Sequence, residues 1–191
     1  MAEIGDDLAD RPRLAPVTAK DDPRLAEIFA KGLNGPNGEP LNIFGTLGHH
    51  PDLLKRWIVF AAHVLSKSTL PPRDRELLIL RTGWNCQSRY EFSQHAIIAL
   101  SCDISPDEVS RTKGDPSSDD AWSGHDVLLL RAADELHTSS TLSDEVWAGL
   151  SATYDATQML DLIAAVGNYH LVAMFLNATR VALDDGVPDA L

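Results

Sequence analysis

The stretch from residue 73 to residue 101 holds the side chains of this sequence that are best suited to proton transfer. Glu91 and His95 stand four residues apart, so on a helix they lie on one face, about 40° from eclipsed. A histidine beside a carboxylate can accept and donate protons near neutral pH. Glu76, from the preceding helical pattern, is a second carboxylate for the same imidazole. The spacing alone also fits an ordinary helix pair in which His95 only satisfies a polar contact in the core.

The helix expected around His95 is apolar on most of its circumference. Its apolar residues are Phe92, Ala96, Ile97, Ile98, Ala99 and Leu100. We therefore expect a helix that is buried nearly all round, with His95 in the interior. Burial disfavours a charged imidazole unless a carboxylate stands beside it, and Glu91 and Glu76 are the two candidates.

The motifs in this stretch resemble those of the carboxymuconolactone decarboxylase and alkyl hydroperoxidase D-like superfamily. In the peroxidase branch of that superfamily, a helix with a glutamate is followed by a Cys-x-x-Cys-x-x-x-His helix. When the sequences are aligned on His95, Glu76 falls on the glutamate of the family. Ser88 and Glu91 then occupy the two cysteine positions, so the redox pair is missing. The tripeptide YEF at residues 90–92 is similar to that of the decarboxylase-like branch.

Further segments extend the resemblance over residues 40 to 185. They are NIF at 42–44, HP at 50–51, LPPRDRE at 70–76, GNYH at 167–170 and LN at 176–177. The resemblance implies an alkyl hydroperoxidase D-like helical bundle that assembles into a homotrimer or a hexamer.

The resemblance also implies an enzyme, a cofactor-independent lyase or decarboxylase of aromatic compound catabolism. Its substrate would be a small cyclic or aromatic-derived carboxylic acid or lactone. We predict His95 as the acid/base, Glu91 as its orienting or second proton-transfer group, and Glu76 as support. The predicted substrate-binding residues are Tyr90, Ser88, Asn168, Tyr169, His170 and His50. No cofactor and no metal are expected.

Two other functions remain open from the sequence. A thiol-dependent peroxidase would use Cys86, but Cys102 lies beyond the histidine and forms no local pair with it. A non-catalytic oligomeric binding protein would use the polar cluster only to fix the helix register. The two cysteines give no zinc pattern. A metal site from the two glutamates and His95 is disfavoured, because three ligands without a second histidine fit few metals well.

The composition limits the partners and the location. The 191-residue chain has a net charge of -12 at pH 7 and no basic stripe, which argues against nucleic acid and anionic membranes as partners. Two cysteines outside any spaced framework fit a reducing cytoplasm. We see no leader pattern and no apolar run near the roughly 20 residues that cross a bilayer, so we expect a soluble cytoplasmic protein.

Helical periodicity dominates the chain. No stretch alternates with the strand period of two, so we expect an all-α protein with an N-terminal arm at residues 1–22 and a single helical domain at residues 23–191. The longest helix is expected from Thr157 to about Asp184. Gly167 inside it suggests the close approach of another helix or a ligand, because glycine costs a helix roughly 1 kcal/mol against alanine.

Overall fold

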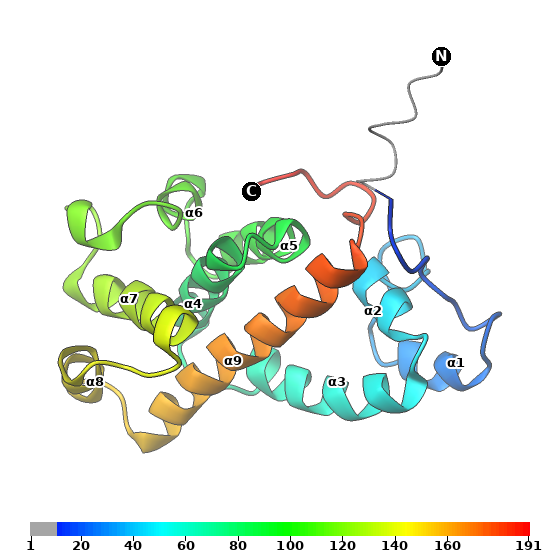
Figure 1. Cartoon of the computed structure of the whole chain (residues 1–191), viewed down its shortest axis with the longest axis horizontal. Coiled ribbons are helices and arrows are strands. Elements are labelled where there is room, and N and C mark those ends of the chain that lie inside the picture. Colours follow the sequence, from blue (N-terminus) through cyan, green and yellow to red (C-terminus); the bar gives the residue numbers. More distant parts are fainter. Residues whose placement is uncertain (1–10) are drawn as a thin grey trace, which may run out of the picture.

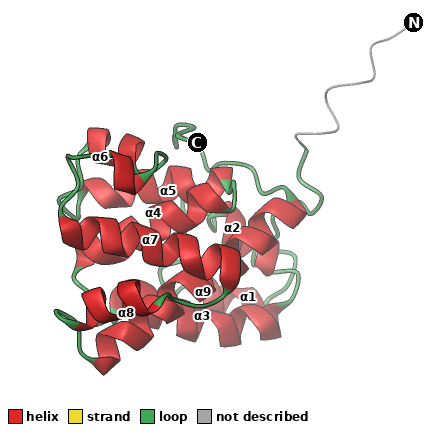
Figure 2. Ribbon diagram, turned by 60° about the vertical axis from the view of Figure 1, so that its left-hand side comes forward, coloured by secondary structure: helices red, strands yellow, loops and turns green. Residues whose placement is uncertain are grey.

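The computed structural model describes residues 11–191, and over these residues the secondary structure is helical, with no strand (Figure 2). The elements are α1 (Arg24–Phe29), α2 (Asn42–Leu47), α3 (Pro51–Ser66), α4 (Pro72–Asn85), α5 (Arg89–Leu100), α6 (Pro106–Arg111), the short 3-10 helix η1 (Pro116–Ser118), α7 (Gly124–Ser139), α8 (Asp144–Ser151) and α9 (Ala156–Thr179). The predicted all-α class is confirmed.

Local sequence signals fix the ends of several helices. Ser105, Ser123 and Asp155 each begin a helix with a reciprocal capping box, in which the cap side chain and the third helical residue satisfy each other's backbone N–H groups. Helix α9 ends at Thr179, because Arg180 adopts the left-handed conformation with φ of 55°. The predicted end near Asp184 is therefore wrong.

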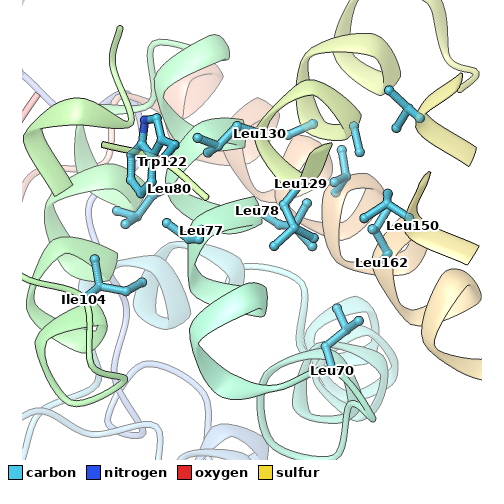
Figure 3. Packing of buried hydrophobic residues seen from close by; sticks show 14 of the residues in the cluster. Leu70, Leu77, Leu78, Leu80, Ile104, Trp122, Leu129, Leu130, Leu150 and Leu162 are labelled. Carbon is cyan, nitrogen blue, oxygen red and sulfur yellow. The ribbon is translucent and has the colours of Figure 1, made fainter. Parts of the chain in front are cut away.

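Helix α4 lies between two apolar clusters. The first joins α4 and α5 to α7, α8 and the first half of α9, and includes Leu78, Leu130 and Leu162 (Figure 3). The second joins α1, α2 and α3 to the second half of α9 and receives Ile79 from α4. Helix α9 crosses the molecule beside α3 and thus belongs to both clusters (Figure 1).

Helix α4 is buried on all sides, and α5 is not. Residues 76–83 of α4 are all buried, including Glu76 and Arg81. In α5 the second half is buried on one side only: Ala99 is fully buried, whereas Ile97 and Leu100 are 44% and 53% exposed. The expectation of an α5 helix buried nearly all round is therefore wrong for its second half.

Two glycines differ in what surrounds them. A Cβ added at Gly83 would lie 3.2 Å from Oε1 of Glu91 and 3.4 Å from the backbone nitrogen of Phe92, so the absence of a side chain lets α4 and α5 approach closely. Gly167 in α9 faces open space, with no atom within 4 Å of an added Cβ. Among the described residues, no helix of this chain approaches Gly167 closely.

Extended segments at both ends of the described chain pack against the helices. Residues 1–10 of the predicted arm lie outside the described residues, whereas residues 11–22 run along α2 and the end of α9. Here Val17 donates its N–H to Gly45 and Arg13 donates to Thr179. After α9, the chain returns over α5, where Ala190 donates its N–H to Oγ of Ser93 at 3.0 Å. Both segments thus close over the helical bundle.

Helix α9 has the length and composition of a membrane span, which the sequence expectation overlooked. It is the one such helix among residues 11–191, and 56% of its most apolar window is buried inside the structure. It also carries the buried polar residues Asp161 and Asn168. The core helix of a soluble protein passes the same test of length and composition.

Candidate active site

A buried hydrogen bond connects α4 to α5. Oε2 of Glu76 lies 2.7 Å from Nδ1 of His95, and their side chains are 0% and 9% exposed. The other oxygen of Glu76 accepts from Nη2 of Arg75 at 3.0 Å. Burial by itself raises the pKa of Glu76, but His95 and Arg75 outweigh it and hold the pKa below its usual value. Glu76 is therefore a carboxylate at neutral pH.

Glu91 has the opposite environment. It is 2% exposed, and neither of its carboxyl oxygens has a hydrogen-bond partner among the described residues. Burial raises the pKa of Glu91 well above its usual value, which favours the uncharged acid. The hydrogen-bonding partner of His95 is thus Glu76, although Glu91 lies one turn before His95 on α5.

Tyr169 of α9 also packs against His95. Its ring meets the His95 ring edge to face, with 4.8 Å between the ring centroids. Burial raises the pKa of Tyr169, and the nearby Glu76 and Glu91 raise it further, so the hydroxyl stays protonated. One imidazole therefore lies among a carboxylate, a neutral carboxylic acid and a phenol. Two carboxyl groups whose pKa values are shifted in opposite directions are typical of acid/base sites.

The other predicted substrate-binding residues on α5 and α9 have varied surroundings. Ser88 is fully buried at the N-cap of α5, and its hydroxyl has no partner among the described residues. Tyr90 donates its hydroxyl to Asp184 of the C-terminal segment. Asn168 accepts from the Trp57 indole at 3.1 Å. The Ser88 hydroxyl is thus without a partner, whereas the Tyr90 hydroxyl and the side-chain oxygen of Asn168 are engaged.

The two predicted histidines lie elsewhere. His50 is exposed at the N-cap of α3, where its Nδ1 accepts from the N–H of Leu53 at 3.3 Å. His170 points toward His137 of α7, with 2.8 Å between Nε2 of His170 and Nδ1 of His137. Neither histidine contacts His95 in any of the described interactions.

Two surface cavities of the chain lie away from His95. One is between α7, α8 and α9 and includes Leu136, Trp147 and Ile163 in its wall. The other lies between the two end segments, from Pro16 to Asp184. Neither is lined by Glu76, Glu91 or His95. Of these three residues, His95 has the largest exposed fraction, 7%, so it is the one nearest to solvent.

Cys86 has a histidine neighbour that the sequence did not indicate. Its Sγ lies 3.8 Å from Nδ1 of His137, which comes from the end of α7. Burial, with a contribution from Glu91, raises the pKa of the Cys86 thiol to about 11. The two cysteines, Cys86 and Cys102, are both free. A protonated thiol is a weak nucleophile, so this geometry does not favour thiol chemistry.

Comparison with known proteins gives one family match. The model of the carboxymuconolactone decarboxylase family matches residues 51–123, a segment that contains Glu76, Glu91 and His95. A search of curated proteins finds no match.

Several solved structures share the fold. A peroxidase-related protein from Ralstonia eutropha, described as an alkylhydroperoxidase AhpD core, is 17% identical, and the alignment covers 88% of this chain and 87% of that one with a TM-score of 0.71. A peroxidase-related protein from Silicibacter is 12% identical, with 98% and 97% coverage and a TM-score of 0.72. A variant of the debrominase Bmp8, solved with 2,3,4-tribromopyrrole, is 16% identical, with 90% and 91% coverage and a TM-score of 0.69.

The arrangement of helices is therefore the alkyl hydroperoxidase D-like helical fold. The family match over residues 51–123, together with this shared fold, supports the resemblance to the carboxymuconolactone decarboxylase and alkyl hydroperoxidase D-like superfamily that the motifs predict.

Proposed function

We propose that this protein is a cofactor-independent, decarboxylase-like lyase in which His95 transfers a proton. The observation that carries the proposal is the buried 2.7 Å contact between Glu76 and His95, with the uncharged Glu91 one turn away. The substrate is a small cyclic or aromatic-derived carboxylic acid or lactone, as the family resemblance implies. A homo-oligomer, a cytoplasmic location and a role in aromatic compound catabolism belong to the same proposal.

The site has the groups that such a reaction needs. Decarboxylation breaks the bond between a carbon and its carboxylate, leaves the electron pair as an enolate, and ends when that carbon takes a proton. A protonated His95, stabilised by the Glu76 carboxylate, can deliver this proton, and its proton is then replaced from solvent. Glu91 and Tyr169, both protonated, are hydrogen-bond donors of the kind that stabilises an enolate oxygen.

A lactone isomerisation would use the same groups in the other order. A neutral His95 would take a proton from the carbon beside the carbonyl, forming the enolate and an imidazolium that Glu76 stabilises. The same proton would then return to a different carbon, so no other reactant is required.

The proposal is tested by screening carboxylated lactones and ring-cleavage acids with direct detection of carbon dioxide and of ring isomers. For a substrate so found, His95→Gln should lower kcat/KM at least about 100-fold, the lower range for loss of general acid/base catalysis. His49→Gln is the matched control, because His49 is exposed and its ring nitrogen Nε2 bonds the carbonyl of Ala15 in the arm segment. Unchanged turnover by His95→Gln would rule the proposal out.

A non-catalytic oligomeric binding protein is the second candidate, because neither of the two cavities described above reaches His95. In that case the buried polar group would only fix the packing of α4 on α5. Substitution of His95 would then change stability while the whole substrate panel remained unconverted by the unmodified protein.

A thiol-dependent peroxidase based on Cys86 has less support, since its thiol pKa is raised and both cysteines are free. Peroxide turnover that is lost in Cys86→Ser and kept in His95→Gln would favour it over the lyase.

A further inference from the structure

We propose that Cys86, His137 and His170 form a binding site for a divalent transition-metal cation of the zinc type. This site is separate from the Glu76 and His95 pair, so it does not rest on the proposed lyase function. Its three residues come from the end of α4, the last turn of α7 and the middle of α9. Among the cysteine, histidine and acidic side chains of the described residues, those of this group place three possible ligand atoms close enough together to bind one ion.

The distances match what a small metal ion requires. Sγ of Cys86 lies 3.8 Å from Nδ1 of His137, Nδ1 of His137 lies 2.8 Å from Nε2 of His170, and all three atoms lie within 4.8 Å of one another. Zn–S and Zn–N bonds of about 2.3 and 2.0–2.1 Å at tetrahedral angles place such ligand atoms roughly 3.3–3.6 Å apart. Binding therefore needs the most widely separated pair, at most 4.8 Å apart, to close by up to roughly 1.2–1.5 Å, a change that two side chains can share.

The ring of His170 is already oriented for metal binding. Its Nδ1 lies 3.0 Å from the carbonyl oxygen of Val166 one turn earlier on α9 and donates its proton there. Nε2 then carries the lone pair. In the ion-free chain it accepts from Nδ1–H of His137, and it can bind the metal when His137 shifts its proton to Nε2 of its own ring. A backbone carbonyl that holds the second ring nitrogen is the usual support of a metal-bound histidine.

Hydrogen bonds between the helices hold the three positions together. Asn177, two turns after His170 on the same face of α9, donates to the carbonyl of Cys86 at 2.9 Å. Asn85, beside Cys86, donates to Asp134 at 2.7 Å, and Asp134 lies one turn before His137. The backbones that carry the ligands are therefore fixed to one another before any ion binds, which reduces the entropic cost of binding.

The ligand set indicates the class of ion. One thiolate and two imidazoles suit a borderline-soft ion such as Zn²⁺, whereas Mg²⁺ and Ca²⁺ prefer oxygen ligands. Binding breaks the S–H bond of Cys86, forms the S–metal bond and releases one proton to solvent. His137 is exposed and the other two ligands are half-buried, so the ion has an open approach and a fourth position for water.

The experiment uses the full-length chain treated with a chelator and then titrated with ZnCl₂ in a calorimeter. One Zn²⁺ should bind per chain, with heat and proton release that are absent for MgCl₂. Co²⁺ should replace it and give the near-ultraviolet absorption of a thiolate–cobalt bond. Cys86→Ser, which changes a single atom, and His137→Gln should each weaken Zn²⁺ binding at least about 100-fold.

Cys102→Ser and His49→Gln are the matched controls and should bind Zn²⁺ as the unmodified chain does, because neither residue lies in the cluster. Circular dichroism of each variant shows whether the helices are intact. Equal Zn²⁺ affinity in Cys86→Ser, or bound Co²⁺ without thiolate absorption, would overturn the proposal. So would a folded chain that binds no Zn²⁺.

Discussion

At the scale of single residues, Glu76 and Glu91 respond to pH in opposite ways. Both are buried acids, and of the two only Glu76 is hydrogen-bonded to His95. Glu76 is hydrogen-bonded to His95 and Arg75 and remains charged, whereas Glu91 has no partner among the described residues and is stabilised as the neutral acid. The contributions of Glu76 and Glu91 to the free energy of unfolding should therefore change with pH in opposite directions.

As the pH rises, the free energy of unfolding of the Glu91→Gln variant should increase relative to that of the unmodified protein. Because the folded pKa of Glu91 is raised, the folded state holds a proton that the unfolded state releases above about pH 4.5. The unmodified protein thus loses stability as the pH rises from there toward the folded pKa, by up to about 1.4 kcal/mol per pH unit. Glu91→Gln removes this loss. Chemical denaturation from pH 4 to pH 8 should show the difference in unfolding free energy growing in favour of the variant.

Glu76→Gln is the matched control, with the opposite expectation. Its folded pKa is lowered, so its contribution is fully present above the unfolded pKa and is lost as the pH falls through the folded pKa. The variant should be less stable than the unmodified chain at pH 7, and the gap should narrow below about pH 4.5. A pH-independent difference for both variants would mean that neither shift exists.

Sequence reasoning reached some of these residues and not others. The family motif brought Glu76 and His95 together, since both lie in one segment. The spacing of Glu91 and His95 suggested a contact, but the side chain of Glu91 packs toward Gly83 of α4. The cluster of Cys86, His137 and His170 was not predictable, because its members are up to 84 positions apart and meet only when α4, α7 and α9 pack.

At the scale of helices, α4 is tied to its neighbours by buried polar contacts as well as by apolar packing. Arg81 binds Asp134 of α7 through two nitrogens, at 2.6 and 2.8 Å, and also donates to the carbonyls of Thr112 and Gly114. These contacts connect α4 to α7 and to the segment that follows α6. The apolar periodicity predicted the helices, but such cross-links depend on tertiary packing and leave no local pattern.

Arg81→Leu should lower the free energy of unfolding by about 3 kcal/mol, because Asp134 loses its cationic partner and keeps only Asn85 as a donor, and two carbonyls lose the Arg81 donor. Thermal and urea denaturation measure the loss. Arg56→Leu serves as the comparison, since Arg56 is exposed and lies 4.0 Å from Asp52 on the surface of α3, where the change should stay within about 0.5 kcal/mol. Equal effects of the two substitutions would contradict the role given to Arg81.

At the scale of the whole molecule, large apolar side chains remain exposed on one side of α9 and on α3. The exposed apolar residues of these two helices are Leu53, Val59, Phe60, Leu160, Ile163, Leu171 and Met174. Leu160, Ile163, Leu171 and Met174 follow one another at helical spacing along α9. A continuous apolar face of this kind usually marks a protein interface.

We predict that light scattering coupled to gel filtration will give a mass three or six times the 20.8 kDa of one chain. Leu160→Glu combined with Met174→Glu should shift the protein toward single chains, since two carboxylates would have to be desolvated in the interface. Glu145→Gln on the exposed face of α8 is a control for the handling of variants. A single-chain mass for the unmodified protein would contradict the prediction.

The enclosure of α4 also bears on which substitutions the protein can accept. A typical surface helix tolerates replacement at every third or fourth position, because one side of it meets only water. Residues 76–83 of α4 have neighbours in every direction. In a saturation mutagenesis scan, substitutions at every position of this segment should thus destabilise the protein. In α3, positions that accept substitutions should alternate with positions that do not, with the period of the helix. The centre of the bundle would then be the part of the chain whose sequence can change least.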